Sequence, residues 1–371
     1  MRPENLPALT SLRFLAAGAI VAFHLGKQFD LYRAGILANG VSFFFVLSGF
    51  ILAYNYRDLP DGTGRYLVSR FARIWPIHLV TFLLACLALA PSGDVLSAIA
   101  NLLLLQAWFP HSAYVLSYNS VSWSISVEAF FYILLPLLLV ASRLGLIVAG
   151  IASASFLAAW LVGQSGLFDA ATQRHFSLHF PPMRLAEFAF GVLVARWFAG
   201  GRAGHRILSG TAAEIGSLLV VVAWLLLLRE AAASLRASGN VALFSWLAIC
   251  AGFPAFGLLI CVFANGAGVL SRLLSLRPFV LLGEISFVTY MWHQLVLHFI
   301  RRQGYVEEFG TGAVLTLGLV AVYGGSYLLW RFIEVPARRI ILANVRFWPA
   351  AGERCWRLMP DACSSGAMKT G

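Results

Sequence analysis

The 371-residue chain is 60% hydrophobic and only 12% charged, and its formal net charge is +11. This number of charged residues is too small to cover the surface of a soluble globular protein of this size. The composition therefore predicts an integral membrane protein, which is surrounded by lipid. The 27 basic residues against 16 acidic ones then predict contact with anionic lipid headgroups rather than with nucleic acid.

Apolar segments near the length that crosses a bilayer follow one another along the chain. They cover residues 8–26, 36–55, 74–91, 123–141, 145–163, 182–199, 209–228, 241–264, 278–300 and 311–331. Their apolar runs are continuous, whereas the strands of a membrane barrel would alternate in character. The predicted fold class is therefore all-α, a polytopic transmembrane helix bundle of about ten spans.

The basic residues favour this count. With the N-terminus in the cytoplasm, ten spans leave eight of the 27 basic residues outside, as the positive-inside rule requires. A further apolar stretch, Val95–Phe109, is either an eleventh span or an interfacial segment. Counting this stretch as a span would place Arg143 and the basic cluster at 196–206 on the outer side of the membrane. The positive-inside rule therefore favours ten spans.

These patterns give the expected organisation. We expect a multi-pass protein of the cell (inner) membrane with both termini in the cytoplasm, a transmembrane domain over residues 1–340, and a disordered cytoplasmic tail over 341–371. No bound metal is expected, because no cysteine pair has CxxC spacing. His175 and His179 have a four-residue spacing but lack further ligands nearby.

Two polar residues interrupt the first predicted span. Arg13 and His24 are eleven residues apart, close to three turns of helix, which places both on one face about 16 Å apart. Alone, Arg13 could be a side chain that reaches the interface, and His24 could be bonded to a neighbouring carbonyl. Because ionisable residues in membrane helices usually face a cavity, the shared face favours a pathway through the bundle.

The fourth predicted span begins with a polar stripe. Ser124, Glu128 and Tyr132 recur at every fourth residue, so a hydroxyl, a carboxylate and a phenol share one helical face. Glu128 must pair, protonate or meet water, and the structural alternative is an interhelical hydrogen bond. Glu128 and His24 are expected at a similar depth in the membrane. Glu128 could therefore orient the imidazole of His24, which would act as the general base.

Arginines cluster before the third predicted span. Arg65, Arg70 and Arg73 precede Trp75-Pro76, and their planar forks suit the phosphates of a nucleotide-like donor. The alternative is ordinary anchoring of the span at its cytoplasmic end.

Three further polar patterns lie in later spans. Ser286, Tyr290 and His293 fall on one stripe, which helix packing explains as well as substrate contact does. Arg184 and Glu187, three residues apart, predict a local ion pair. At Glu334-Val335-Pro336, the proline predicts the end of the last helix at the cytoplasmic boundary.

Six of these segments, in this order, carry a family resemblance. They are Arg13 and His24 with ten residues between them; Gly40–Phe50, which includes Ser42 and Ser48; Arg70 and Arg73 before Trp75-Pro76; Ser124, Glu128 and Tyr132; Gly283–His293, which includes Ser286 and Tyr290; and Glu334-Val335-Pro336. Together they resemble the acyltransferase-3 family of membrane proteins, which includes bacterial O-antigen, exopolysaccharide and macrolide-sugar acyltransferases. The resemblance covers about residues 6–340.

The resemblance implies an enzyme that moves an acyl group, often acetyl, from cytosolic acyl-CoA to a hydroxyl of an extracytoplasmic glycan or lipid-linked sugar. Acyl-CoA would be a co-substrate, and no cofactor would be bound permanently. On this hypothesis Arg13, Arg70 and Arg73 bind the donor and His24 is the general base, with the acyl group moving either directly or through an acylated His24.

The remaining candidates have supporting roles in this hypothesis. Glu128 would orient His24, and Ser124 or Tyr132 would assist. Residues that could line the substrate path are Ser42, Ser48, Ser286, Tyr290 and His293. The alternative function is a sugar or lipid transporter or flippase, because buried arginine, histidine and glutamate suit a translocation path too, although no inverted repeat is evident.

Overall fold

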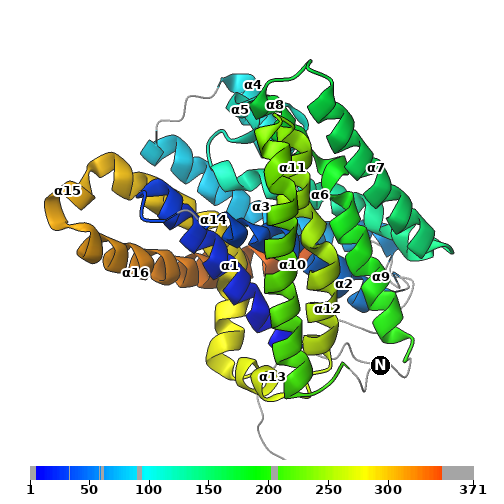
Figure 1. Ribbon diagram of the computed structural model, residues 1–371. Helices are drawn as coiled ribbons and strands as arrows, with labels where there is room; N and C mark the ends of the chain where they lie inside the picture. The colour runs from blue at the N-terminus through cyan, green and yellow to red at the C-terminus, as the bar shows by residue number, and fades with distance from the viewer. Residues whose placement is uncertain are drawn as a thin grey trace, which may run out of the picture.

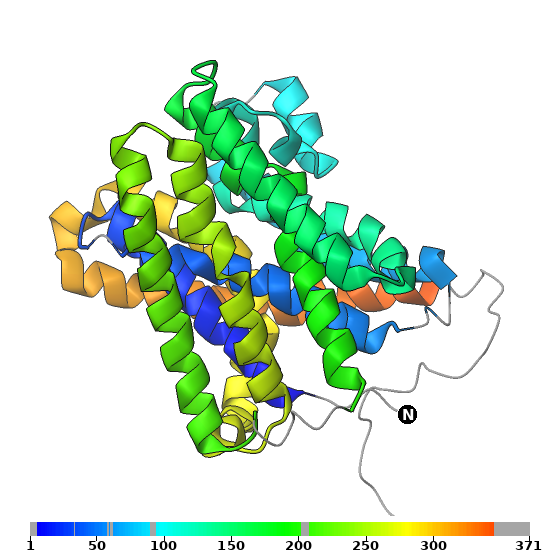
Figure 2. The ribbon, with the colours of Figure 1, turned by 45° about the vertical axis from the view of Figure 1, so that its right-hand side comes forward.

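A computed structural model describes residues 6–344, except for residues 33, 58, 60–61, 90–93 and 202–207. Within these ranges the secondary structure consists of helices and turns without a β-strand, so the predicted all-α class is confirmed (Figures 1 and 2). Residues 345–371, which make up most of the predicted tail, lie outside the described residues.

Twelve helices build the body of the bundle within the described residues. They are α1 (Pro7–Gln28), α2 (Gly40–Asn55), α3 (Gly62–Leu89), α6 (Trp123–Val140), α7 (Leu144–Gln164), α9 (Leu185–Ala199), α10 (Thr211–Ala237), α11 (Val241–Ile249), α12 (Phe253–Ala264), α14 (Arg277–Gln303), α16 (Thr311–Leu329) and α17 (Val335–Asn344). The short helices are α4 (Val95–Leu102), α5 (Ser112–Val115), α8 (Ala170–Leu178), α13 (Val269–Leu274) and α15 (Tyr305–Phe309). Of these, α4, α5 and α8 gather at one end of the molecule and α13 lies at the other (Figure 1).

Nine helical segments of the described chain are long and apolar enough to cross a membrane, and they match nine of the ten predicted spans. The tenth, residues 182–199, corresponds to the 3₁₀ turn η4 (Pro181–Arg184) followed by α9, which has only 15 residues. The segment Val95–Phe109 contains α4, whose eight residues extend about 12 Å and cannot cross a bilayer core of about 30 Å. The structure therefore favours the interfacial alternative for that segment.

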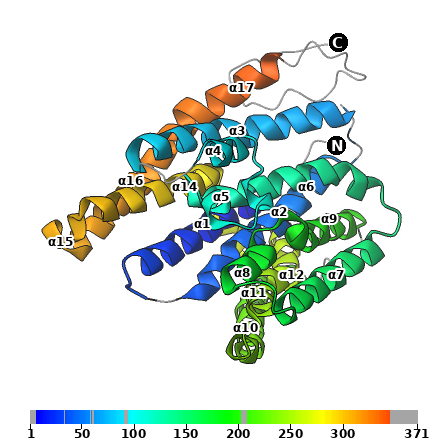
Figure 3. The same ribbon diagram turned by 90° about the horizontal axis from the view of Figure 1, so that it is seen from above.

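The last predicted span does not end at Pro336, which corrects the boundary expected from the sequence. Helix α16 passes through a π-helical turn, η7 (Trp330–Glu334), into α17, so one helical segment runs over Thr311–Asn344. Pro336 is the second residue after this wider turn, so the N–H that it lacks falls where the regular hydrogen-bond pattern of the helix is already interrupted. As a result α17 continues alongside α3 (Figure 3).

Helices α2 and α9 pack at the centre of the bundle, backbone against backbone. A Cβ atom at Gly49 would collide with the carbonyl oxygen of Phe188, and one at Gly191 would collide with that of Val46. Small residues permit this close approach between membrane helices, where van der Waals packing replaces the hydrophobic effect. The contact fixes α2, which lines the cavity described below.

Helices α1 and α14 form a second closely packed pair. Gly283 lies against the backbone of Thr10, where a side chain would not fit. The hydroxyl of Ser11 also donates to the carbonyl of Leu274, just before α14, at 2.5 Å. The two helices run in the same direction, so the polar residues of α1 follow the length of α14.

Candidate functional site

A cavity of about 140 Å³ lies among α1, α2, α3, α6 and α14. Four charged side chains line it: Arg13, Arg70, Arg73 and Glu128. The rest of the wall is mainly aliphatic and aromatic, with hydroxyl groups from α2, α6 and α14. The structure thus brings all three predicted donor-binding arginines to one cavity, together with the predicted carboxylate.

The arginines are only partly neutralised by the protein. Arg73 forms an ion pair with Glu334 of η7, whose side chain is 2% exposed. Arg70 donates to neutral oxygens, the phenol of Tyr56 at 3.1 Å and the hydroxyl of Ser69 at 3.3 Å. Glu128 and Glu284, both within electrostatic reach of Arg13, bring the number of carboxylates to three. Arg338, within reach of Arg70 and Arg73, brings the guanidinium groups to four, and the one excess positive charge would favour an anionic ligand.

Glu128 holds two hydroxyl groups at the cavity wall. Its Oε1 accepts hydrogen bonds from Tyr132 at 2.6 Å and from Ser48 of α2 at 3.2 Å. Arg13 lies within electrostatic reach of both Glu128 and Tyr132. The carboxylate is therefore associated with the arginine end of the cavity.

A hydrogen-bonded pair of hydroxyls lines another part of the cavity wall. Ser124 donates to the phenol oxygen of Tyr290 at 2.8 Å, and Tyr290 donates to the carbonyl of Val121 at 2.9 Å. Ser124 and Tyr132 are eight residues apart on α6, which corresponds to about 12 Å along the helix. The hydroxyl pair and the arginines thus lie on separate parts of the wall.

His24 does not line the cavity, and it contacts a second histidine close to Tyr290. Its Nδ1 is 3.1 Å from Nε2 of His293 and 3.1 Å from the carbonyl oxygen of Ile20. The ring of His293 is in turn 6.0 Å from the ring of Tyr290. The first helix therefore carries Arg13 at the cavity and His24 outside the cavity wall, next to α14.

The predicted pairing of Glu128 with His24 is wrong. Glu128 bonds to Ser48 and Tyr132, and His24 bonds to α1 and α14. The expectation assumed a similar depth for the two residues. In the folded chain Glu128 lies one turn further along α6 than Ser124, on the side of Arg13, while the close contact of α1 with α14 turns His24 toward His293.

Comparison with known proteins gives the same protein family as the sequence motifs. A family model described as an acyltransferase domain matches residues 6–331. The chain belongs to the acyltransferase-3 family. Acyltransferase MdmB of Streptomyces mycarofaciens is 32% identical over 92% of this chain and 93% of that protein. Nodulation protein 10 of Rhizobium leguminosarum bv. viciae is 26% identical over 85% of this chain and 87% of its own length.

A longer relative also matches. A Staphylococcus aureus (strain COL) protein named as an O-acetyltransferase is 24% identical over 90% of this chain, which spans 57% of that protein. No solved structure matches the chain. With its helical spans, the family assignment makes this protein a multi-pass membrane acyltransferase, which answers the choice between enzyme and transporter in favour of the enzyme.

Three predicted path residues of this acyltransferase do not line the cavity: His293, which contacts His24, and the two serines Ser42 and Ser286. The hydroxyl of Ser42 donates to the carbonyl of Ile249 at 2.8 Å and accepts from Arg184 at 3.0 Å. Ser286 donates to the carbonyl of Gly283 in its own helix at 2.6 Å. Both hydroxyls are buried and bonded, so their surroundings are those of packing contacts.

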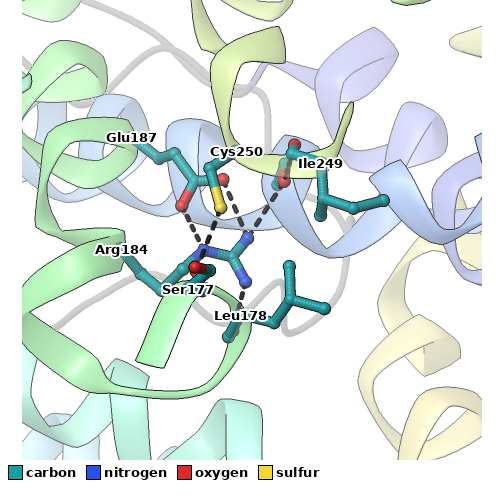
Figure 4. Close-up of polar contacts among 7 residues, drawn as sticks. Ser177, Leu178, Arg184, Glu187, Ile249 and Cys250 are labelled. Atoms are coloured by element: carbon teal, nitrogen blue, oxygen red, sulfur yellow. Dashed lines mark hydrogen bonds and ion pairs between the residues drawn. The ribbon is translucent and has the colours of Figure 1, made fainter. Parts of the chain in front are cut away.

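The predicted ion pair of Arg184 with Glu187 is confirmed, with a shortest distance of 2.6 Å (Figure 4). Both side chains are 1% exposed. Arg184 also donates to the carbonyl of Leu178 at 2.7 Å, and its guanidinium group lies over the rings of Phe45, at 4.8 Å, and Trp123, at 5.7 Å. We call Arg184, Glu187 and Ser42 the buried arginine cluster.

Sequence reasoning missed the contribution of α17 to the arginine end. Arg338 lies within electrostatic reach of Arg70 and Arg73, and Glu334 pairs with Arg73. Glu334 and Arg338 are four residues apart, so a continuous helix places both on one face. The four-residue spacing is visible in the sequence, but a helix that ended at Pro336 would not place the two residues on one face.

Proposed function

We propose that this membrane acyltransferase moves an acyl group, with acetyl as the expected one, from acyl-CoA in the cytosol to a hydroxyl of an extracytoplasmic or lipid-linked sugar. The observation that carries the proposal is the cavity, which is lined by arginines and by Tyr290, with the histidine pair close to Tyr290. The printed names of the relatives, acyltransferase and O-acetyltransferase, support the acyl part of it.

The arginine end suits the phosphates of acyl-CoA. Guanidinium groups bind phosphate through paired hydrogen bonds, and Arg13, Arg70 and Arg73 come from two helices that converge there. Arg338 on α17 would add a fourth positive charge. A cavity of about 140 Å³ is smaller than most sites for drug-sized ligands, about 300–1,000 Å³, so it suits a short acyl group on its thioester arm, with the phosphates at the arginines and the adenosine outside.

The chemistry would take place beyond Tyr290. The acyl group would pass this residue toward His24, which acts as general base on the acceptor hydroxyl. As the hydroxyl oxygen attacks the thioester carbon, its proton moves to His24, the carbon–sulfur bond breaks, and His24 returns the proton to the leaving thiolate. Ser124 would assist by holding the Tyr290 phenol, and Glu128 by holding Tyr132 and offsetting the charge of Arg13.

The proposal includes an orientation in the inner membrane. Arg13 lies two turns from the start of α1, and the arginines of α3 lie near its start as well. With both termini in the cytoplasm, these arginines face the cytosolic donor and His24 lies toward the outer leaflet, where the sugar is found.

Replacing His24 tests the proposal. His24→Ala protein, purified in detergent, should bind acetyl-CoA with unchanged affinity and transfer no label to acceptor, because only the base is lost. Membranes given labelled acetyl-CoA would show which glycan or lipid becomes labelled. His111→Ala serves as the control, because His111 is exposed and its bond is local, to the N–H of Ala113.

The outcomes separate the enzyme from its alternatives. Loss of label with His24→Ala and full label with His111→Ala supports the proposal. Full transfer by His24→Ala eliminates the base assignment. Surface glycan of unchanged mass together with altered sugar export would contradict acyl transfer to sugar altogether.

A further inference from the structure

The histidine pair between α1 and α14 fixes which nitrogen of each ring carries a proton. Nδ1 of His293 lies 3.1 Å from the carbonyl oxygen of Thr289, and a carbonyl oxygen can only accept. In a neutral ring, Nδ1 of His293 is therefore protonated and its Nε2 has a free lone pair. That lone pair faces Nδ1 of His24 at 3.1 Å.

The same reasoning applies to His24 from an independent contact. Its Nδ1 lies 3.1 Å from the carbonyl oxygen of Ile20, so this nitrogen also has to donate. One N–H thus serves both Ile20 and Nε2 of His293, and the two contacts agree on the tautomer. In neutral His24 the lone pair is on Nε2, for which the described residues provide no hydrogen-bond partner.

We propose that His293 is a positioning residue for the acyl transfer: it accepts the Nδ1 proton of His24 in a hydrogen bond and so keeps Nε2 of His24 as the base. The inference rests on the proposed function, because it presumes that His24 is the base. It replaces the carboxylate that the sequence suggested with a neutral imidazole on α14, a residue of which no part is exposed.

The contact between His24 and His293 also stabilises His24 while it carries the extra proton. When Nε2 of His24 takes the hydroxyl proton, the ring becomes an imidazolium whose Nδ1–H points at the lone pair of His293. A hydrogen bond to a charged donor is stronger than one between neutral groups, so the contact strengthens as the charge develops. His293 keeps the proton on its own Nδ1, hydrogen-bonded to the Thr289 carbonyl, throughout, and His24 passes its extra proton to the departing thiolate.

A neutral partner suits this position. His293 lies among buried residues of α14, including Val288, Met291 and Val296, where an unpaired carboxylate would be costly. An imidazole supplies the acceptor without a charge. Since Thr289 is on the same helix one turn earlier, the backbone of α14 sets the direction of the ring.

Three substitutions at His293 separate positioning from packing. In His293→Gln the amide oxygen reaches the place of Nε2 and can still accept from His24, whereas in His293→Asn the shorter amide reaches only the place of Nδ1. His293→Leu removes both contacts. We expect kcat to fall about 10- to 100-fold in the Leu and Asn variants, the size of effect that loss of an orienting partner has on metal-bound histidines. The KM for acetyl-CoA should stay unchanged, and the Gln variant should retain kcat within a few-fold.

The matched control is His298→Leu, the same change on the same helix. His298 bonds to Gln294 at 3.0 Å and lies within electrostatic reach of His24 and His293 without a hydrogen bond to either, so kcat should stay within a few-fold of the wild-type value. Wild-type and His24→Ala protein are measured beside these variants. If the wild type transfers no acetyl group, or His24→Ala transfers it fully, the proposed function fails. If these two behave as expected but a folded Leu or Asn variant keeps full kcat, or a folded Gln variant is as slow as Leu, only the role of His293 is overturned.

Discussion

Two sites in this membrane domain combine arginine with glutamate, and their surroundings differ. In the buried arginine cluster, Arg184 reaches the carboxylate of Glu187 and the carbonyl of Leu178 (Figure 4). It also reaches the hydroxyl of Ser42, and its face is covered by Phe45 and Trp123. At the cavity, by contrast, arginine side chains border open space.

The difference shows how to tell a structural charge from one that is available to a ligand. Charged groups in a membrane protein have to be compensated, by the protein itself or by what binds. The buried arginine cluster is compensated from within, so its expected role is to join α8, α9 and α2. The cavity keeps an excess of positive charge, and the phosphates of a donor would complete it.

The largest expected effect comes from breaking the buried arginine cluster. Arg184→Met should lower the free energy of unfolding by about 3–5 kcal/mol, because Glu187 remains as a buried charge without its partner. Thermal unfolding of the purified protein in detergent measures the loss. The double variant Arg184→Met/Glu187→Met should recover most of it, since no charge is left unpaired. A single variant as stable as the wild type would contradict the structural role.

At the cavity, removing a charge should weaken binding and leave the fold intact. Arg70→Gln should raise the Kd for acetyl-CoA about 10- to 100-fold, the equivalent of one or two charge-assisted hydrogen bonds to phosphate. Its melting temperature should change little, because Arg70 bonds to hydroxyl groups of Tyr56 and Ser69 rather than to a buried carboxylate. Isothermal titration measures the Kd.

The control for this prediction is Arg57→Gln. Arg57 is an exposed arginine beyond the end of α2, and its guanidinium group lies over the ring of Tyr54. The substitution removes the same charge, and the Kd should stay at the wild-type value. Equal weakening by both variants would mean that overall charge, rather than the cavity, governs donor binding.

The contrast between the two sites also shows what the sequence could predict. The helical class and nine of the spans follow from composition and length, because lipid leaves few alternatives to apolar helices. The pair Arg184–Glu187 was predicted because its spacing is local. Likewise, Glu128 and Tyr132 were correctly placed on one face of their helix.

Contacts between distant helices could not be predicted in this way. The partner of His24 is 269 residues away on α14, and it is chosen by the packing of Gly283 against Thr10 rather than by any local pattern. The assignment of Glu128 to His24 failed because matching depths within a bilayer does not identify neighbours. The role of α17 does not follow from the sequence, because a proline ordinarily ends a helix, whereas here one helical segment continues to Asn344.

The smallest expected effect concerns acid sensitivity, and it also distinguishes the two sites. His175 of α8 and the adjoining His179 lie beside the buried arginine cluster, outside the spans. Burial lowers the pKa of His175 to about 4 and that of His179 to about 3, and the neighbouring Arg184 and Arg174 contribute to the second shift. Between pH 6.5 and about 4 the unfolded chain therefore binds more protons than the folded one, so stability falls as the pH is lowered.

Melting temperatures measured in detergent between pH 8 and pH 5 test this. The wild type should lose several degrees toward pH 5, and His175→Gln/His179→Gln should show a shallower slope, because glutamine does not titrate. Binding of acetyl-CoA to the folded protein over the same range should differ little between the two proteins, since neither histidine lines the cavity. An unchanged slope in the double variant would mean that acid destabilises the fold at groups other than these two histidines.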